Sequence, residues 1–381
     1  MRDFYEFFAG GGMVRAGLGQ GWRCIFANDF DPKKTRIYTQ NWGNAELNTD
    51  SVESLISSDL PGHAHLAWAS FPCQDLSLAG LGAGLKGDRS GMFRPFWNLM
   101  KALVEEKRAP SLIVIENVCG TLNSHQGRDF ETICRGFVEA GYSLGAIVID
   151  AVLFVPQSRP RLFVIAVKDR LTIPIDLIAA GPLSAWHNKR LGSAYAKLPE
   201  DVKARWIWWN LPLPRVRRLS FTDIIEDDPT GTGWFSADET IRLIGMMSKV
   251  NRLKLAKVQQ LGRPIIGGVY KRTRQDDAGR AVQRAEIRFD NVSGCLRTPG
   301  GGSSRQIILM VNGQTVKARL ISTRETARLM GLRDSYKLPE NYNEAYHLTG
   351  DGVVVPVVRH LAKYIFEPIL DSAAKKKTMA A

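Results

Sequence analysis

The sequence is poor in cysteine and has no long apolar run, and these two shortages limit the classes of protein to which it can belong. Its 5 cysteines lie far apart and include no CxxC pair, so neither a disulfide framework nor a metal site is predicted. No apolar stretch approaches the length that crosses a bilayer, and the first residues, MRDFYEFFAGGGM, lack the regions of a signal peptide. We therefore expect a cytoplasmic protein in which any cysteine chemistry comes from a single thiol.

Acidic residues are also scarce relative to basic ones. The chain contains 51 lysines and arginines against 38 acidic residues, a formal net charge of +13. The excess is concentrated in 249–305, which holds 13 basic and 4 acidic residues. A solvated lysine-rich surface would explain an ordinary basic run, but here arginines dominate and stand in turn-rich sequence such as YKRTRQDDAGR and LRTPGGGSSRQ. We therefore predict a nucleic-acid partner.

The 381 residues, 44% of them hydrophobic, are enough for two domains. In 1–167, short apolar runs alternate with helical stretches, the pattern of a doubly wound α/β sheet. In 168–318 the alternation stops, and an aromatic cluster (RWIWWN), a proline-rich connection and glycine-rich loops indicate a smaller, irregular domain. The regular pattern returns in 319–370, which we expect to complete the first domain, and the tail 371–381 is expected to be disordered.

The first apolar run leads into FFAGGGMVRAGL, a glycine-rich turn before a helix. In doubly wound folds, such a turn and an acidic residue at the end of the next strand, here Asp29 in FANDFD, hold the adenosine part of a nucleotide. The match to GxGxxG is partial, because Arg15 stands where the third glycine belongs. A tight turn without a ligand therefore remains an alternative at this point.

Cys73 stands in WASFPCQDLSLAG, directly after a proline at the end of an apolar run. A lone cysteine is more often a small buried residue than a nucleophile. Its place at the carboxyl end of a predicted strand, where open α/β sheets bind ligands, favours chemistry instead. The run SLIVIENV predicts Glu116 at the same edge, and QSRPRLFVI predicts Arg159 and Arg161 on one face of a strand. A thiol, a carboxyl group and two arginines are expected to converge there.

Taken together, these blocks resemble the cytosine-5 DNA methyltransferases of bacterial or phage type. FFAGGG, FPCQ, ENV, QSRPR, RLMGL and GDGVVVPVV stand in the family's order and cover about 1–167 and 319–367. The resemblance implies a Rossmann-like methyltransferase sheet, with a target-recognition domain in 168–318 inserted before the C-terminal segment. It also implies S-adenosylmethionine as the methyl donor and a cytosine flipped out of double-stranded DNA as the acceptor.

The resemblance assigns the chemistry to four side chains. Carbon 5 of cytosine is a poor nucleophile, so the Cys73 thiolate would add at carbon 6 and turn carbon 5 into an enamine-like nucleophile. A protonated or hydrogen-bonding Glu116 would stabilise the negative charge that develops at ring nitrogen 3 and would also bind the exocyclic amine. Arg161 would hold the carbonyl oxygen, and Arg159 would orient neighbouring groups. The sequence indicates no dedicated base for the carbon 5 proton, so an ordered water is expected to take it.

The resemblance also implies binding residues. Around the adenosine part of the cofactor it places Phe8, Ala9, Gly10, Gly12, Asp29, Phe30 and Asp50. Around the methionine part it places Pro72, Phe93 and Asp351. On the DNA it places Gln74 and Ser77 together with two recognition loops, GGVYKRTRQ and LRTPGGGSSRQ, which contain Arg272, Arg274, Arg297, Ser303 and Arg305. Asp351 departs from the family, which usually carries asparagine there, and we expect it to cap a helix beginning near Val353 rather than act on the sulfonium charge.

Three alternatives remain open. A nicotinamide-dependent dehydrogenase would share the glycine turn and Asp29, but it would need neither FPCQ nor QSRPR. A catalytically silent DNA-binding relative is disfavoured by the intact Cys73, Glu116 and Arg161. The same chemistry on RNA is disfavoured by the large basic recognition segment. We expect a monomer, and nothing in the sequence identifies the target bases or a cognate restriction endonuclease.

Overall fold

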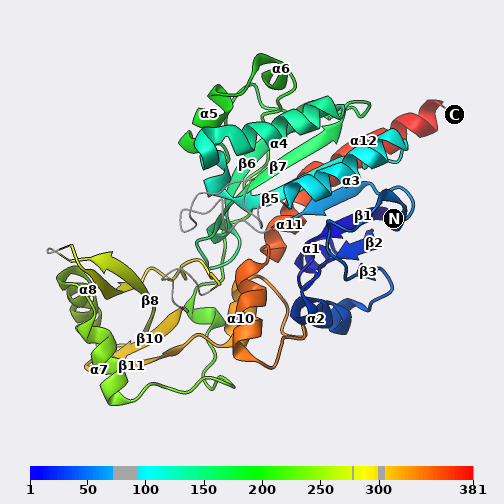
Figure 1. Ribbon diagram of the computed structural model, residues 1–381. Helices are drawn as coiled ribbons and strands as arrows, with labels where there is room; N and C mark the ends of the chain where they lie inside the picture. The colour runs from blue at the N-terminus through cyan, green and yellow to red at the C-terminus, as the bar shows by residue number, and fades with distance from the viewer. Residues whose placement is uncertain (72–91, 277–278, 299–304, 381) are drawn as a thin grey trace. The chain divides into compact units, whose positions relative to one another are not determined.

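The chain forms two compact units, shown in Figure 1. The computed structural model describes residues 1–71, 92–276, 279–298 and 305–380. Unit 1 comprises Met1–Asp150, Pro160–Arg215 and Val353–Ala381. Unit 2 comprises Ala151–Arg159 and Val216–Gly352. The units therefore divide the chain at other residues than the predicted domain boundaries.

A seven-stranded sheet forms the centre of unit 1, in the order β3-β2-β1-β4-β5-β7-β6. Strands β3 to β5 in this order are parallel, whereas β7 runs antiparallel to both β5 and β6. The strands are β1 (Arg2–Phe7), β2 (Trp22–Asn28), β3 (Leu47–Asn48), β4 (Leu66–Ala69), β5 (Leu112–Val118), β6 (Tyr142–Asp150) and β7 (Pro160–Lys168). The carboxyl ends of the parallel strands meet at one edge of the sheet, and the start of β7 joins them there. The predicted doubly wound, Rossmann-like fold is thereby confirmed.

Helices cover both faces of this sheet. On one face, α3 (Phe93–Glu105) and α4 (Arg128–Glu139) contribute their apolar stripes to the main hydrophobic core. On the other face, the ring centroids of Trp68 and Phe366 lie 6.4 Å apart. There, α1 packs so closely on α11 that a Cβ on Gly17 would collide with Val358. The remaining helices of unit 1 are α1 (Met13–Leu18), α2 (Pro32–Trp42), α5 (Lys189–Ala196), α6 (Glu200–Lys203), α11 (Val355–Leu361) and α12 (Glu367–Ala380).

The C-terminal helix is longer than the sequence indicated. Helix α11 continues through a π-helical turn, Ala362–Phe366, into α12. Residues 371–380, which we expected to be disordered, continue α12, because their alanines, lysines and methionine are strong helix formers. Arg2 anchors this helix to β1 through an ion pair with Asp371 at 2.5 Å. Within the described ranges, no helix combines the length and apolarity that crossing a membrane requires.

Residues 168–215 fall in unit 1 because they cover the edge strand β6. The Leu144 amide donates to the Arg205 carbonyl at 3.0 Å, and the Ile207 amide donates to the Leu144 carbonyl at 2.7 Å. A Cβ on Gly145 would overlap the Ile207 carbonyl, so this close approach requires glycine. The aromatic cluster RWIWWN is thus part of the cover of the seven-stranded sheet, which explains why the unit boundary lies near Arg215.

Unit 2 contains a four-stranded antiparallel sheet in the order β11-β10-β8-β9, so the recognition segment is more regular than its sequence indicated. The strands are β8 (Ile265–Gln275), β9 (Ala281–Arg288), β10 (Ile307–Asn312) and β11 (Thr315–Leu320). The helices are α7 (Ala237–Gly245), α8 (Lys249–Gln259), α9 (Thr323–Leu329) and α10 (Tyr342–Asp351). Apolar side chains of α7 and α8, including Leu243 and Leu255, pack on strand residues such as Val269 and Leu309.

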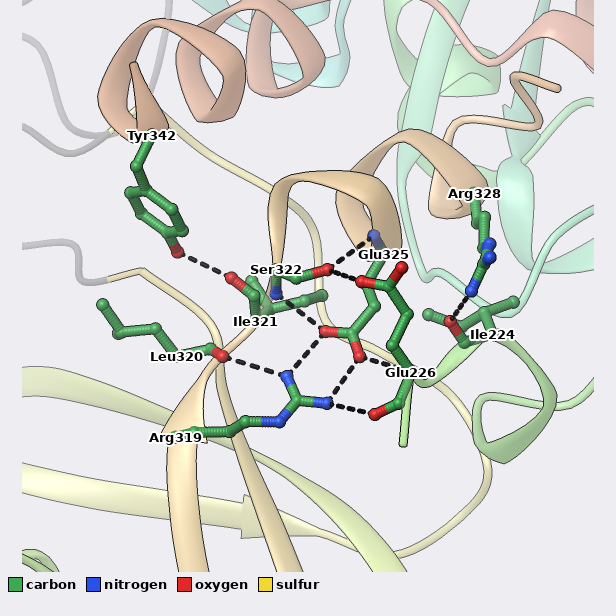
Figure 2. A network of polar contacts seen from close by, with 9 residues as sticks. All are labelled: Ile224, Glu226, Arg319, Leu320, Ile321, Ser322, Glu325, Arg328 and Tyr342. Carbon is green, nitrogen blue, oxygen red and sulfur yellow. Dashed lines mark hydrogen bonds and ion pairs between the residues drawn. The ribbon is translucent and has the colours of Figure 1, made fainter. Parts of the chain in front are cut away.

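A buried ion pair holds α9 to this sheet and assigns it to unit 2. Arg319 and Glu325 are fully buried, and two guanidinium nitrogens donate to the two carboxylate oxygens at 2.6 and 2.8 Å, as Figure 2 shows. Glu325 also accepts from the amides of Ser322 and Glu226, both at 2.7 Å. Arg319 donates in turn to the Glu226 carbonyl at 3.0 Å. The helix expected in STRETARLMGL is present, but its start is fixed to the recognition sheet.

Candidate functional site

The carboxyl edge of the large sheet begins with the turn between β1 and α1. Phe8, Gly10 and Gly12 all have positive φ, at 56, 55 and 76°. A Cβ on Gly12 would overlap the indole of Trp42, whose ring nitrogen donates to the Gly11 carbonyl at 2.9 Å. The glycine-rich turn therefore depends on glycine for its shape as well as for its backbone angles.

Asp29 lies directly after β2, beside this turn. Its carboxylate accepts from the Gly10 amide at 2.8 Å and from the Asp31 amide at 3.0 Å. Because Asp29 is buried, the pKa of its carboxyl is raised, although these hydrogen bonds act in the opposite direction. The next residue, Phe30, is 62% exposed. A buried carboxylate thus stands next to an open aromatic ring.

Asn28 joins several of the predicted cofactor residues, and sequence reasoning missed it. Its carbonyl accepts from the Ala9 amide at 2.9 Å, and its side chain donates to the Asp50 carbonyl at 2.8 Å. The signal for Asn28 was a polar residue ending an otherwise apolar strand. Phe93, in contrast, is only 2% exposed and stacks on Trp97 at 5.9 Å, so it belongs to the core.

Glu6 is a second functional candidate that sequence reasoning missed. It is buried in β1, and its carboxyl accepts from the Val14 amide in the first turn of α1 at 3.2 Å. Burial raises the pKa of Glu6 to about 8, and the charge of Arg15 opposes this shift. A single acid within the apolar run FYEFF was the signal. Glu6 thus holds the helix that follows the glycine turn.

Strands β5 and β7 bring Glu116 and Arg161 together, as predicted for this edge. Arg161 lies opposite Val118, and its Nε is 3.2 Å from Oε1 of Glu116. Glu116 is buried, and the Arg161 side chain is 16% exposed. The half-buried Cys119 follows β5. Burial raises the pKa of its thiol, and the charge of Arg161 partly offsets this.

Arg159 does not share a strand face with Arg161, so that expectation is wrong. Strand β7 begins at Pro160, and Arg159 is a buried residue of unit 2. The reason is that its guanidinium donates to three backbone carbonyls, each at 2.8 Å, those of Leu296, Gly350 and Gly352.

The predicted nucleophile belongs to a part of the chain that the structure does not describe. The predicted site residues outside the described ranges are Pro72, Cys73, Gln74, Ser77 and Ser303. The last described residue before them, Phe71, is buried just after β4. Its ring packs edge-to-face on Phe8, with centroids 6.4 Å apart. Strand β4 therefore brings the chain to the glycine turn just before Cys73.

The arginines predicted to contact DNA occupy two settings in unit 2. On the hairpin, Arg272 and Arg274 both pair with Glu286 of β9, and their Nε atoms lie 3.4 and 2.6 Å from its carboxylate oxygens. In the second predicted loop, Arg297 is exposed. Arg305 donates to the Asn343 side chain at the start of α10. The second loop is thus held by a helix, whereas the hairpin arginines share one carboxylate.

Asp351 contacts the other described end of that loop. It is the last residue of α10, and its carboxylate accepts from the hydroxyl of Thr298. A Cβ on Gly350 would lie 3.2 Å from the Thr298 amide, so the two segments approach closely. The expectation that Asp351 caps the following helix is wrong, because α11 begins at Val355 and its N-cap residue, Val354, makes no side-chain cap.

Comparisons with known proteins agree with this geometry. The family model of the C-5 cytosine-specific DNA methylases matches residues 2–367. The type II methyltransferase M.NlaX of Neisseria lactamica is 25% identical, covering 95% of this chain and 96% of the relative. M.HhaI of Haemophilus parahaemolyticus is also 25% identical, covering 94% and 92%. Among solved structures, the Entamoeba histolytica methyltransferase EhMeth shares the fold, with a TM-score of 0.62, 14% identity and coverage of 96% of this chain and 98% of that one.

Proposed function

The chain belongs to the C-5 cytosine-specific DNA methylase family, and from that membership we propose which of its residues do the work. The enzyme transfers a methyl group from S-adenosylmethionine to carbon 5 of cytosine in DNA. The family mechanism passes through a covalent cysteine adduct. The dehydrogenase alternative is thereby set aside, and the assignments below concern individual side chains.

S-Adenosylmethionine fits the residues around the glycine turn. A ribose joined to adenine needs a hydroxyl-binding carboxylate beside an aromatic surface, and the neighbouring Asp29 and Phe30 supply both. Phe8 and Asp50 complete our assignment for the adenosine part, and the glycines let the backbone approach it. When bound, the cofactor supplies a methyl group on a positively charged sulfur. For Asp351, the bond with Thr298 supports a structural role over contact with the methionine part.

The Glu116–Arg161 pair is the observation that best supports the assignment of the base-binding site. The carbonyl oxygen and ring nitrogen 3 of cytosine are adjacent atoms on one edge, so two side chains that contact both must be neighbours. Arg161, 3.2 Å from Glu116, suits the oxygen. With a proton on its carboxyl group, Glu116 would donate to nitrogen 3, and its other oxygen would accept from the exocyclic amine. Glu116 is buried and Arg161 is partly buried, which strengthens their interaction with the charge that develops on the ring.

We assign the covalent step to Cys73. Its thiolate forms a bond to carbon 6, and the displaced electron pair makes carbon 5 nucleophilic towards the methyl group. After methyl transfer, the proton on carbon 5 passes to a water, and the electrons of that C–H bond restore the double bond as the sulfur leaves. The target base must leave the stack for this sequence, because neither face of carbon 6 is accessible within a duplex.

Arg159 is a positioning residue in this proposal. Its guanidinium binds the Leu296 carbonyl, and the side chain of Gln157 accepts from the Leu296 amide at 3.0 Å. Both backbone groups of Leu296 are therefore fixed immediately before Arg297, one of the residues proposed to contact DNA. The same guanidinium fixes the Gly350 carbonyl, so Arg159 orients two segments rather than the substrate.

The setting of the enzyme follows from its relatives and its substrate. Type II methyltransferases among the relatives make a modification role beside a restriction endonuclease the context we propose. We propose a monomer as the working state. We further propose that it acts in the cytoplasm, associated with the nucleoid through DNA. The bases read by unit 2 are left to experiment.

Bisulfite sequencing of DNA from cells expressing the protein tests the function and reveals the target sequence. Wild type should also be trapped covalently on duplex DNA containing 5-fluorocytosine at the target. Cys73→Ala should abolish methylation and trapping while leaving S-adenosylmethionine affinity nearly unchanged. Cys119→Ala, which removes a described thiol that interacts with Arg161, is the matched control and should retain trapping. Methylation that survives in Cys73→Ala would sink the mechanism.

A further inference from the structure

Unit 2 contains an open pocket of about 680 Å³ between the start of α8 and β9. Its lining consists of Met247, Ser248, Lys249, Arg252, Leu253, Ala256 and Arg284. The lining thus holds three cations and no carboxylate. None of these residues belongs to the two loops assigned above to DNA reading.

The cations of this pocket are available to a ligand. The side chains of Lys249 and Arg284 make no hydrogen bond or ion pair with any residue in the described ranges, unlike those of Arg272 and Arg274, which share Glu286. Arg252 donates one guanidinium nitrogen to the Gly245 carbonyl at 3.0 Å, which fixes its position. The pocket therefore concentrates positive charge, and its lining contains no acidic residue.

The backbone around the pocket is firmly held. The Ala285 amide donates to the Met246 carbonyl at 3.1 Å, and the Ile287 amide donates to the Asn251 side chain at 3.1 Å. These bonds attach the segment between α7 and α8 to the edge strand β9. Lys249 lies on α8 and Arg284 lies on β9. Because hydrogen bonds join these two elements, the fold of unit 2 sets the distance between the two side chains.

We propose that this pocket binds the phosphodiester backbone of duplex DNA independently of sequence, as an anchor beside the reading loops. A pocket of this size is too large for one small anion, but it accommodates a phosphate with its flanking sugars. The apolar side chains of Leu253 and Ala256 suit the deoxyribose, and the cations suit the phosphate. The proposal rests on the proposed function, because it takes duplex DNA as the substrate.

The test measures the salt dependence of DNA affinity for Lys249→Ala/Arg284→Ala. Each lost phosphate contact should lower the slope of log K against log salt by about 0.9, so we expect a decrease of about 1.8. The loss should be the same on target and non-target duplexes, and bisulfite sequencing should find the methylated sequence unchanged. Lys249→Gln/Arg284→Gln repeats the measurement with longer side chains, and circular dichroism checks the fold of both variants.

Lys254→Ala/Lys257→Ala is the matched control. It removes the same charge from exposed positions of α8 that do not line the pocket. The proposal would be overturned if the salt dependence of DNA affinity were unchanged in the pocket variants. It would also be overturned if the control showed an equal decrease. Wild-type methylation and trapping are scored in parallel. Failure of the pocket therefore remains distinguishable from failure of the proposed function.

Discussion

The two units of the protein place their charged groups in opposite ways. At the carboxyl edge of unit 1, the carboxyl groups of Glu6, Asp29 and Glu116 are buried and held by backbone amides or by an arginine. In unit 2, the cations of the hairpin and α8 lie at the surface, and the buried pair Arg319–Glu325 is internal. Fixed, buried polar groups suit a site where bonds form, whereas exposed cations suit a long polyanion. The difference supports our proposal that unit 1 carries the chemistry and unit 2 the attachment to DNA.

Breaking the internal pair of unit 2 is the largest expected effect on stability. Arg319→Leu leaves Glu325 as an uncompensated buried charge, which should lower the free energy of unfolding by about 3–5 kcal/mol. Urea denaturation followed by tryptophan fluorescence measures this loss. Asp334→Ala breaks the exposed pair with Arg328 and should cost no more than about 1 kcal/mol. Similar losses in the two variants would contradict the comparison between buried and exposed charge.

The same contrast explains how much the sequence could predict. Unit 1 was predictable because its strands are continuous apolar runs, and its functional side chains follow strand ends. The sheet of unit 2 was not, because β8 and β9 are rich in arginine, glutamine and glycine, and their pairing depends on contacts distant in the chain. The burial of Arg319 shows the limit most clearly. Nothing local to the sequence ARLIS indicates that its arginine is enclosed.

The site divides along similar lines. The Glu116–Arg161 pair forms because β5 ends and the antiparallel β7 begins at one edge of the sheet, and the motifs ENV and QSRPR mark these two places in the sequence. The position of Arg159 could not be predicted from the motif, because Arg159 lies just before the start of β7 and its guanidinium binds backbone carbonyls of unit 2. Side chains that bind backbone have no sequence signature at their partners. Reasoning from motifs therefore identified Arg159 but assigned it to the wrong place.

Glu6→Gln tests the buried carboxyls of unit 1 through pH. The pKa of Glu6 is about 8 in the folded protein, above its ordinary value near 4.5. Between these values the unfolded chain loses its proton and the folded one keeps it, so the stability contributed by Glu6 falls as pH rises towards 8. The variant has no such proton to lose. At about 1.4 kcal/mol per pKa unit, we expect its free energy of unfolding to rise by about 1–3 kcal/mol relative to wild type between pH 5 and pH 8.

Thermal unfolding at pH 5, 6.5 and 8 measures this gain. A difference between variant and wild type that stays constant with pH would show that Glu6 is ionised throughout this range. The buried site in unit 1 would then tolerate a charge in the same way as the pair in unit 2.

Glu286→Gln tests whether the exposed hairpin arginines bind DNA. It removes the carboxylate that Arg272 and Arg274 share, so it should raise DNA affinity about threefold to tenfold at low salt and steepen the salt dependence. Arg274→Ala should act in the opposite direction, with S-adenosylmethionine affinity unchanged. Asp290→Asn, which removes the partner of Arg288, controls for net charge. If Asp290→Asn raised DNA affinity as much as Glu286→Gln does, the effect would come from net charge and not from the hairpin arginines.

Asp351→Asn is expected to have the smallest effect, because it keeps the contact that the carboxylate makes. The hydroxyl of Thr298 donates to Asp351, and an asparagine oxygen can accept the same hydrogen bond. The change also removes a negative charge from the C-terminus of α10, where the helix dipole disfavours it. Turnover and S-adenosylmethionine affinity should therefore stay within a factor of about ten, roughly 1.4 kcal/mol. Asp351→Leu removes the acceptor and should reduce turnover more than the asparagine variant does. If Asp351→Asn instead lost far more cofactor affinity, with its circular dichroism unchanged, the carboxylate would have to act on the sulfonium charge, and a residue of unit 2 would share the chemistry reserved here for unit 1.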